Sequence, residues 1–280
     1  MVGVIGSGQV AQHVIEELRR RNLRFKVYTR SLQPDADAGV FVSYTPETIA
    51  QQLRDDDVTA VINCAALRDI NLCEKNPTEA VHANVDLPAA IGNTVKQLYI
   101  STDYVYDLNE EDRKLDEDVP SRGALSIYGQ TKLRGEAEVL QRGGAVARIS
   151  SPWGRHPSPM KAHFVDMVTM TGKPMDLPTD QFFTPTYLPD AAPVLVDLAV
   201  NPSRGIYHVV NQGKTNWHEF ARGARSLARN KAKITGSMRW DNTRPRNGAL
   251  VNNRLPRLRT WMEAMQEYLS GPRAEERIKR

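Results

Sequence analysis

The sequence predicts an α/β protein with a doubly wound parallel sheet and a smaller C-terminal lobe. Over the first half of the chain, short β-rich runs alternate with helical patterns, which is typical of a parallel sheet wrapped by helices. A turn with two glycines, Gly6-Ser7-Gly8, follows the first of these runs. After Ser150 prolines and glycines become frequent and the helical patterns shorten, which indicates a second lobe.

The elements of the first half can be predicted in order. The run from Val2 to Ile5 is predicted as a strand, and apolar residues every four positions from Val10 to Leu18 then form one helical face. Thr45 and Pro46 supply an N-cap and a first-turn proline for a further helix. The other predicted elements are strands at Phe25–Tyr28, Val58–Cys64, Gln97–Ser101 and Ala145–Ile149 and a long helix at Tyr128–Leu140.

The change after Ser150 also predicts the domain organisation. Residues 1–150 are predicted to form a nucleotide-binding domain, and residues 151–280 mainly a smaller substrate-binding lobe, with some segments returning to the first domain. Open α/β sheets bind ligands at the carboxyl ends of their strands. We therefore expect the site in a cleft between the two lobes.

Composition excludes several classes of protein. With 40% hydrophobic and 25% charged residues and a mean hydropathy of -0.48, the 280-residue chain has no apolar run long enough for a membrane span. No secretory leader pattern opens the chain, and the two cysteines are too few for a disulfide framework, which predicts a cytoplasmic protein. The net charge of +4 without a basic stripe disfavours nucleic acid, and no histidine pair predicts a metal site.

The turn after the first strand matches a dinucleotide-binding motif. Gly6 to Ala11 fits G-x-G-x-x-A, which allows a tight turn and a close approach of the backbone to a pyrophosphate. This pattern identifies the predicted sheet as Rossmann-type. A second predicted strand ends in small residues, which would let a nicotinamide ribose or pyrophosphate reach the backbone there. The predicted cofactor contacts from these two segments are Gly6, Gly8, Gln9, Val10, Asn63, Cys64, Ala65 and Ala66.

The end of the second predicted strand bears on the choice of cofactor. NAD-specific sites usually place an acidic residue there to bond the ribose hydroxyls. Tyr28-Thr29-Arg30-Ser31 carries no acid, and the guanidinium of Arg30 suits a 2′-phosphate. We therefore predict NADPH and leave NADH open. The alternative is that Arg30 is a solvated surface charge.

The pair Tyr128 and Lys132 indicates the chemistry. On a helix, residues four apart share one face, so the lysine ammonium can lower the pKa of the phenol. Ser101-Thr102-Asp103-Tyr104 ends a predicted strand, which places Thr102 where it could donate a hydrogen bond to a carbonyl oxygen. By itself, the lysine–tyrosine spacing is more often a solvated helix face. Its occurrence together with the strand ends favours a reductase.

These motifs resemble the extended short-chain dehydrogenases/reductases, and more narrowly the dTDP-4-dehydrorhamnose reductase group. The resemblance runs nearly from end to end of the chain. The matching segments are 61–66, Asn84-Val85, 101–106, 128–136, 148–153, 180–186, 205–208 and 244–247.

The resemblance implies an NADPH-dependent reduction of the 4-keto group of a nucleotide-linked 6-deoxysugar. Thr102 would polarise the carbonyl, Tyr128 would donate the proton, and Lys132 would anchor the nicotinamide ribose and tune the phenol. Lys132 and Tyr128 would thus also contact the cofactor. The residues implied at the substrate are Thr102, Asp103, Tyr104, Trp153, Gln181 and Arg244. Relatives often dimerise, so a homodimer stays open.

The resemblance has departures and leaves alternatives. The glycine motif is one residue shorter than the group's usual G-x-x-G-x-x-G and ends in Ala11. Tyr104 follows Asp103, so the Asp-Glu pair of the related dehydratases is incomplete and elimination is disfavoured. An epimerase, and a regulatory subunit that binds the dinucleotide without turnover, both remain open. Trp217, Trp240 and Trp261 are predicted to be packing residues.

Overall fold

The centre of the protein is a parallel sheet. The computed structural model describes residues 1–29, 41–42, 45–106, 112–121, 123–155, 164–201, 203–241 and 243–271. Seven strands pair in the order β11-β6-β5-β4-β1-β2-β3, and every pairing is parallel. The strands are β1 (Val2–Ile5), β2 (Phe25–Tyr28), β3 (Phe41–Val42), β4 (Ala60–Asn63), β5 (Gln97–Thr102), β6 (Ala145–Ile149) and β11 (Gly205–His208). The predicted Rossmann-type fold class is confirmed.

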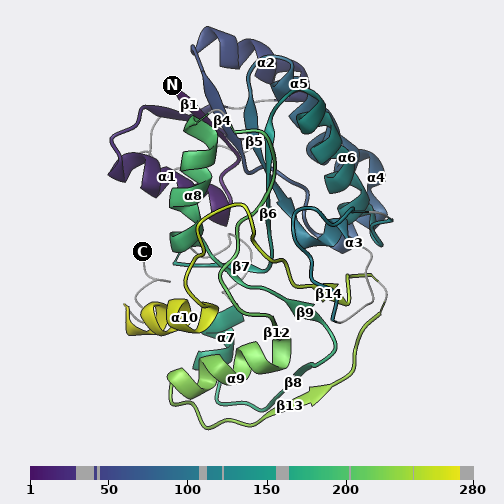
Figure 1. Cartoon of the computed structure of the whole chain (residues 1–280), viewed down its shortest axis with the longest axis vertical. Coiled ribbons are helices and arrows are strands. Elements are labelled where there is room, and N and C mark those ends of the chain that lie inside the picture. Colours follow the sequence, from purple (N-terminus) through teal and green to yellow (C-terminus); the bar gives the residue numbers. More distant parts are fainter. Residues whose placement is uncertain are drawn as a thin grey trace.

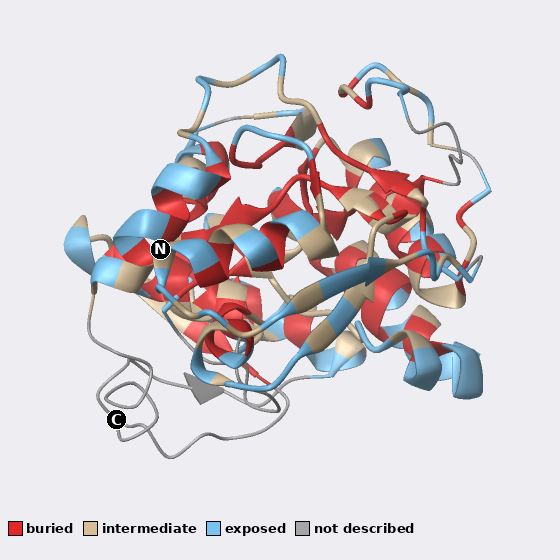
Figure 2. Cartoon of the chain, turned by 90° about the horizontal axis from the view of Figure 1, so that it is seen from below, coloured by how far each residue is buried: buried red, intermediate tan, exposed pale blue. Residues whose placement is uncertain are grey.

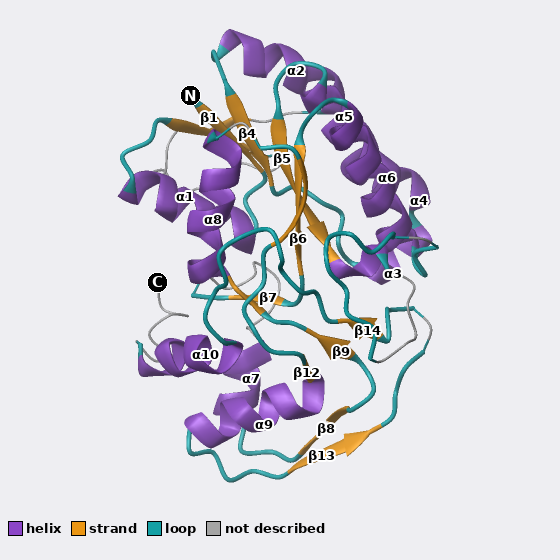
Figure 3. Cartoon of the chain, viewed as in Figure 1, coloured by secondary structure: helices purple, strands orange, loops and turns teal. Residues whose placement is uncertain are grey.

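Helices cover both faces of this sheet (Figure 1). One face carries α1 (Gln9–Arg20) and α8 (Leu188–Val200), and the other carries α2 (Pro46–Asp55), α5 (Leu87–Gly92) and α6 (Ile127–Gln141). The strands β1, β5 and β6 are buried along their whole length, because helices shield them on both sides (Figure 3). Strand order reverses between β1 and β4, and ligands of such sheets bind at that switch point.

A smaller lobe lies beyond the carboxyl ends of the strands. It contains α7 (Phe164–Met170), α9 (Trp217–Leu227) and α10 (Trp261–Ser270). Its strands are β7 (Pro152–Trp153) with β10 (Thr186–Tyr187), β9 (Phe182–Phe183) between β12 (Thr215–Asn216) and β14 (Asn247–Gly248), and β8 (Met175–Pro178) with β13 (Ile234–Ser237). Its core is largely aromatic. The β8–β13 ribbon lies on the outside, with its residues exposed or half-buried (Figure 2).

The chain crosses between the two layers more than once. α8 and β11 come after residue 150, yet α8 packs on α1 and β11 pairs with β6 in the main sheet. The shorter helical segments α3 (Ile70–Lys75) and α4 (Pro77–Val81) and a π-helical turn at His82–Asp86 lead into α5. The domain boundary at residue 150 stays a prediction. Among the described residues, no helix has the length and apolar character that a membrane crossing requires.

Candidate active site

The turn between β1 and α1 is tight and open toward a cleft. Gly6 has a φ of +99°, and a Cβ there would lie 3.1 Å from the backbone nitrogen of Ala65, so the turn requires glycine. A Cβ on Gly8, the N-cap of α1, would meet no atom within 4 Å. The hydroxyls of Ser7 and Thr29 lie 3.2 Å apart and connect the turn to the end of β2. The start of α1 therefore presents free space and backbone N–H groups to an anion.

The predicted cofactor contact Asn63 is hydrogen-bonded to the backbone of the turn that follows β4. Its side chain is fully buried; Oδ1 accepts a hydrogen bond from the backbone nitrogen of Ala65 at 3.2 Å, and Nδ2 donates to Oε1 of Gln97 at 3.1 Å. Asn63 is absent from the cleft wall, whereas Cys64, Ala65 and Ala66 line it. In this structure the Asn63 side chain thus fixes the backbone of Ala65. Burial raises the pKa of the Cys64 thiol to about 12.

A cleft of about 720 Å³ runs from the glycine turn to the smaller lobe. Most of the predicted site residues meet in it, although they come from distant parts of the sequence. Its walls include the predicted residues Gly6, Gly8, Gln9, Val10, Cys64, Ala65, Ala66, Thr102, Asp103, Tyr104, Tyr128, Lys132 and Arg244. Arg30 lies outside the described residues, so its contact with a 2′-phosphate stays a prediction.

Tyr128 stands in the first turn of α6, next to the end of β5. Ser126 caps this helix by accepting a hydrogen bond from the backbone nitrogen of Gly129 at 3.2 Å. The rings of Tyr128 and Tyr104 meet edge to face with centroids 5.5 Å apart. Burial raises the pKa of the Tyr128 phenol above its ordinary value, while a hydrogen bond with Thr102 opposes this rise. The phenol is therefore protonated at neutral pH and able to donate.

Lys132 is buried one helical turn further on. Its Nζ donates to the backbone carbonyl of Ile100 at 2.7 Å and lies 3.7 Å from the centroid of the Tyr99 ring. Burial lowers the pKa of this amine to about 7, against the opposing effect of Glu136. Contrary to the prediction from its spacing to Lys132, the Tyr128 pKa is not below its ordinary value, because burial outweighs every contribution that favours the ionised phenol.

Asp103 lies between the sheet and the smaller lobe. Its Oδ1 accepts a hydrogen bond from the Thr102 hydroxyl at 3.1 Å, and its Oδ2 accepts one from the Ser150 hydroxyl at 2.9 Å. Burial raises the pKa of this carboxyl to about 6, while Ser150, Thr102 and the positive charge of Arg244 oppose the rise. The charge of Asp103 therefore changes near neutral pH.

A buried ion pair holds α6 against the sheet behind these residues. Glu136 on α6 accepts hydrogen bonds from the guanidinium of Arg148 on β6 at 2.9 and 2.6 Å, and both side chains are 2% exposed. Glu136 also accepts a hydrogen bond from Ser101 at the end of β5. The pair therefore ties α6 to the strand that carries Thr102.

The lobe side of the cleft differs from the prediction in its aromatic residues. Trp153, expected at the substrate, is 4% exposed and packs in the lobe core against Tyr187, with centroids 4.5 Å apart. Trp217, expected to be a packing residue, lines the cleft as the first residue of α9 and also packs on Phe183 at 4.5 Å. Gln181 is buried, and its Nε2 donates to the Arg239 carbonyl at 3.4 Å; it is absent from the cleft wall.

Sequence reasoning missed further residues of the cleft wall, of which two are polar and lie next to predicted ones. Arg68 lines the cleft two residues after Ala66. Ser151 also lines it, in a turn with a φ of +41° that favours glycine. The pattern Ser150-Ser151-Pro152 carried a weak signal of a turn, but a lone arginine after a strand end carried none.

His13 connects the nucleotide end of the cleft to the smaller lobe. Its Nδ1 lies 2.9 Å from the backbone carbonyl of Gln9, and its Nε2 accepts a hydrogen bond from the backbone nitrogen of Arg155 at 3.1 Å. Because Nε2 accepts, the ring proton is on Nδ1 and the imidazole is neutral. The ring is 2% exposed.

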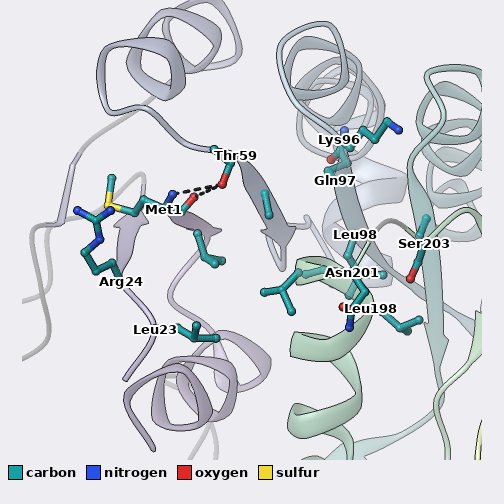
Figure 4. A pocket seen from close by; sticks show the side chains of 15 residues that line it. Met1, Leu23, Arg24, Thr59, Lys96, Gln97, Leu98, Leu198, Asn201 and Ser203 are labelled. Atoms are coloured by element: carbon teal, nitrogen blue, oxygen red, sulfur yellow. Dashed lines mark hydrogen bonds between the residues drawn. The ribbon is translucent and has the colours of Figure 1, made fainter. Parts of the chain in front are cut away.

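A second hollow, of about 470 Å³, lies at the amino ends of the same strands (Figure 4). Val2, Ala60, Gln97 and Ala145 line it at the starts of β1, β4, β5 and β6. The amino group of Met1 donates to the Thr59 hydroxyl at 3.2 Å there. Among the described residues that line it, Arg24 and Lys96 carry cationic side chains and none is a carboxylate.

Comparisons with known proteins place the chain in a family. Residues 2–273 match the family described as the RmlD substrate binding domain. A dTDP-4-dehydrorhamnose reductase from Mycolicibacterium smegmatis is 31% identical over 235 residues, which cover 75% of this chain and 70% of that protein. Methionine adenosyltransferase 2 subunit beta from Bos taurus is 32% identical over 220 residues, which cover 71% of this chain. That match spans 64% of the bovine protein, less than two thirds of its length.

Solved structures with the same fold include two reductases. A dTDP-4-dehydrorhamnose reductase from Bacillus anthracis, in complex with NADP, has a TM-score of 0.83 at 22% identity and covers 96% of this chain and 98% of its own. A dTDP-4-dehydrorhamnose reductase from Clostridium acetobutylicum has a TM-score of 0.81 at 23% identity, with 96% and 99% covered. At these identities the likeness concerns the fold alone.

Proposed function

Because this chain belongs to the RmlD substrate-binding domain family, we propose that it is an NADPH-dependent oxidoreductase that reduces the 4-keto group of a nucleotide-linked 6-deoxysugar. The observation that carries this proposal is the meeting of Thr102, Tyr128 and Lys132 in one cleft with the glycine turn. A turn alone would support binding of a dinucleotide. The three polar side chains add a donor system for a carbonyl oxygen.

The cleft has a place for the dinucleotide at the start of α1. The open side of Gly8, the first N–H groups of α1 and the small residues Ala65 and Ala66 suit a pyrophosphate and ribose. Gln9, Val10 and Cys64 complete the predicted contacts. When bound, a reduced nicotinamide supplies the two electrons and the hydrogen that reach the carbonyl carbon.

Side chains of the protein would supply the proton that the carbonyl oxygen takes up. Tyr128 holds a proton at neutral pH, since burial raises the pKa of its phenol, and it would give that proton to the carbonyl oxygen. Thr102 would donate a hydrogen bond to the same oxygen. Lys132, charged below a pKa of about 7, would favour negative charge on the phenol as the proton leaves. General acid catalysis of this kind is typically worth about 10²–10⁴-fold, and correct positioning supplies a further large part of the acceleration.

The wall of the cleft fits a negatively charged substrate with a flat group. Arg68 and Arg244 bring positive charge to the wall, as the diphosphate of a nucleotide sugar would require. Trp217 offers an aromatic ring in the same wall. Tyr104, also in the predicted substrate set, lines the same cleft and meets the ring of Tyr128 edge to face.

The test is NADPH oxidation with dTDP-4-keto-6-deoxyglucose, for the native chain and for Tyr128→Phe. We expect turnover by the native chain and a loss of about 10²–10⁴-fold in kcat in the variant, with NADPH affinity, measured by fluorescence titration, changed less than threefold. Tyr104→Phe is the matched control, because it removes a neighbouring phenol that has no proposed role in proton transfer. Equal losses in the two variants would contradict the role of Tyr128.

A second candidate is a subunit that binds a dinucleotide and modulates another enzyme. The 32% identity to methionine adenosyltransferase 2 subunit beta favours it. A panel of keto-sugar nucleotides assayed with NADPH and NADH separates the two. Cofactor binding without turnover of any of them would favour the subunit and reject the reductase.

A further inference from the structure

We propose that Asp103 is a positioning residue whose protonation state decides where the hydroxyl proton of Thr102 points, and that the protein reduces its substrate only while this carboxyl is protonated. This inference rests on the proposed function, because it concerns the donor system of that reaction. Asp103 shares its two carboxyl oxygens between Thr102 and Ser150, so it is in direct contact with one of the proposed donors.

The starting point is the hydrogen-bond capacity of one hydroxyl. A threonine hydroxyl has one proton to donate and two lone pairs that accept. In this structure Oγ1 of Thr102 accepts a hydrogen bond from the backbone nitrogen of Tyr104 at 3.2 Å and donates to Oδ1 of Asp103 at 3.1 Å. The hydroxyl proton of Thr102, which the proposed mechanism needs in a hydrogen bond to the ketone oxygen, therefore points to the Asp103 carboxylate instead.

Protonation of Asp103 reverses this hydrogen bond. A protonated Oδ1 donates to Thr102 Oγ1, while Oδ2 still accepts from Ser150. The Thr102 proton can then turn to the oxygen of Tyr128, whose ionised form it would stabilise, or to a ketone oxygen bound beside it. In the ionised form Thr102 can only accept from the cleft, and a ketone oxygen needs a donor.

The surroundings of Asp103 keep both forms accessible near neutral pH. The side chain is 6% exposed, and burial raises the pKa of the carboxyl to about 6. Three titratable groups face it: Arg244 from the loop before β14, Tyr104 from its own turn and Tyr128 from α6. On the remaining side Gly248 of β14 packs so closely that a Cβ there would lie 2.3 Å from Oδ2, so the backbone excludes water.

The first experiment compares pH profiles of kcat/KM for the native chain and Asp103→Asn, each normalised to its own value at pH 5.5. The asparagine carbonyl can accept from Ser150 and its amide can donate to Thr102, as the protonated acid does. In the native chain both Asp103 and Lys132 must be protonated, so the rate falls first near pH 6. In the variant only the fall near pH 7 remains, and the normalised value at pH 7.5 rises roughly 20-fold.

Ser150→Ala is the matched variant that keeps the carboxyl. The Ser150 hydrogen bond lowers the pKa of Asp103, so its removal moves the first fall in rate to higher pH without abolishing it. A second readout needs no turnover: the ¹³C shift of the Asp103 carboxyl, followed from pH 4 to 8, should titrate near 6 in the native chain and higher in Ser150→Ala.

The outcomes separate the two proposals. A profile for Asp103→Asn that coincides with the native one overturns this inference and leaves the reductase standing, as does a carboxyl that stays ionised down to pH 4.5. A native chain that turns over no keto-sugar nucleotide at any pH overturns the reductase, and this inference with it. A variant profile with only the later fall, together with the shift in Ser150→Ala, supports the inference.

Discussion

The carboxyl and amino ends of the same four strands, β1, β4, β5 and β6, border hollows of different character. At the carboxyl ends, the cleft gathers Thr102, Asp103, Tyr128 and Lys132, and burial shifts the pKa of the last three. At the amino ends, the hollow carries the exposed cation Lys96 and the Met1–Thr59 hydrogen bond (Figure 4).

The difference shows that a hollow alone says little about function. Both hollows are of a size that holds a small molecule. They differ in their ionisable groups: at the carboxyl ends such groups are buried and their pKa values are shifted, and perturbed pKa values of this kind cluster at functional sites. The predictions below test this contrast. Each changes a residue at the carboxyl ends of the strands, or in the ion pair behind them, and compares it with a control variant.

The largest difference is expected between variants of two lysines, one at each end of the strands. Lys132→Met should reduce kcat/KM for the keto-sugar nucleotide about 10³-fold, because the phenol loses the charge that favours release of its proton. Lys96→Met, at the amino end, should leave kcat/KM within about twofold, the scatter expected of a surface charge. Steady-state kinetics at pH 6.5 measure both. Comparable losses in the two variants would remove the distinction between the ends.

The next effect concerns the support of the carboxyl end. Glu136→Gln leaves Arg148 buried without its partner charge and should lower the free energy of unfolding by about 3–5 kcal/mol. Glu138→Gln, on the same helix, breaks a half-exposed pair with Arg142 and should cost about 0.3–0.5 kcal/mol. Urea unfolding measures both. A cost below 1 kcal/mol for Glu136→Gln would mean that the buried pair does not stabilise the fold.

The smallest effect is a dependence of stability on pH. The unfolded chain protonates Lys132 with a pKa of 10.5, and the folded chain with a pKa of about 7. Between these values the unfolded state binds one more proton, so stability rises with pH by about 1.4 kcal/mol per unit. Unfolding free energies at pH 8 and 9 should show this increment in the native chain relative to Lys132→Met. An equal pH dependence in the two proteins would show that the amine is hydrated.

Much of the sheet could be predicted because residues adjacent in the sequence are enough to mark its strands and turns. Val2–Ile5, Phe25–Tyr28 and Ala145–Ile149 are strands with the predicted bounds, since each is a short run rich in β-branched or aromatic residues. The glycine turn and the spacing of Tyr128 and Lys132 likewise depend on neighbours in the sequence. Their meeting in one cleft follows from the rule that parallel strands share one carboxyl edge.

The lobe side could not be predicted in the same way. Trp153 and Trp217 exchange their expected places. β7 pairs with β10 and sets Trp153 beside Tyr187 in the lobe core, whereas β12, which leads into Trp217, pairs with β9, which itself pairs with β14. These pairings join segments from three distant parts of the chain, and no local pattern specifies them. Asn63 could not be placed correctly for another reason. Its position at a strand end was predicted, but its side chain points into the protein because it is hydrogen-bonded to Gln97 on the neighbouring strand.

The neutral imidazole of His13 has a mechanical consequence. One ring nitrogen is fixed to the first residue of α1, and the other to the backbone that follows β7. The ring thus joins the two layers at one side of the cleft. Separation of the layers at this point would break one of these two hydrogen bonds.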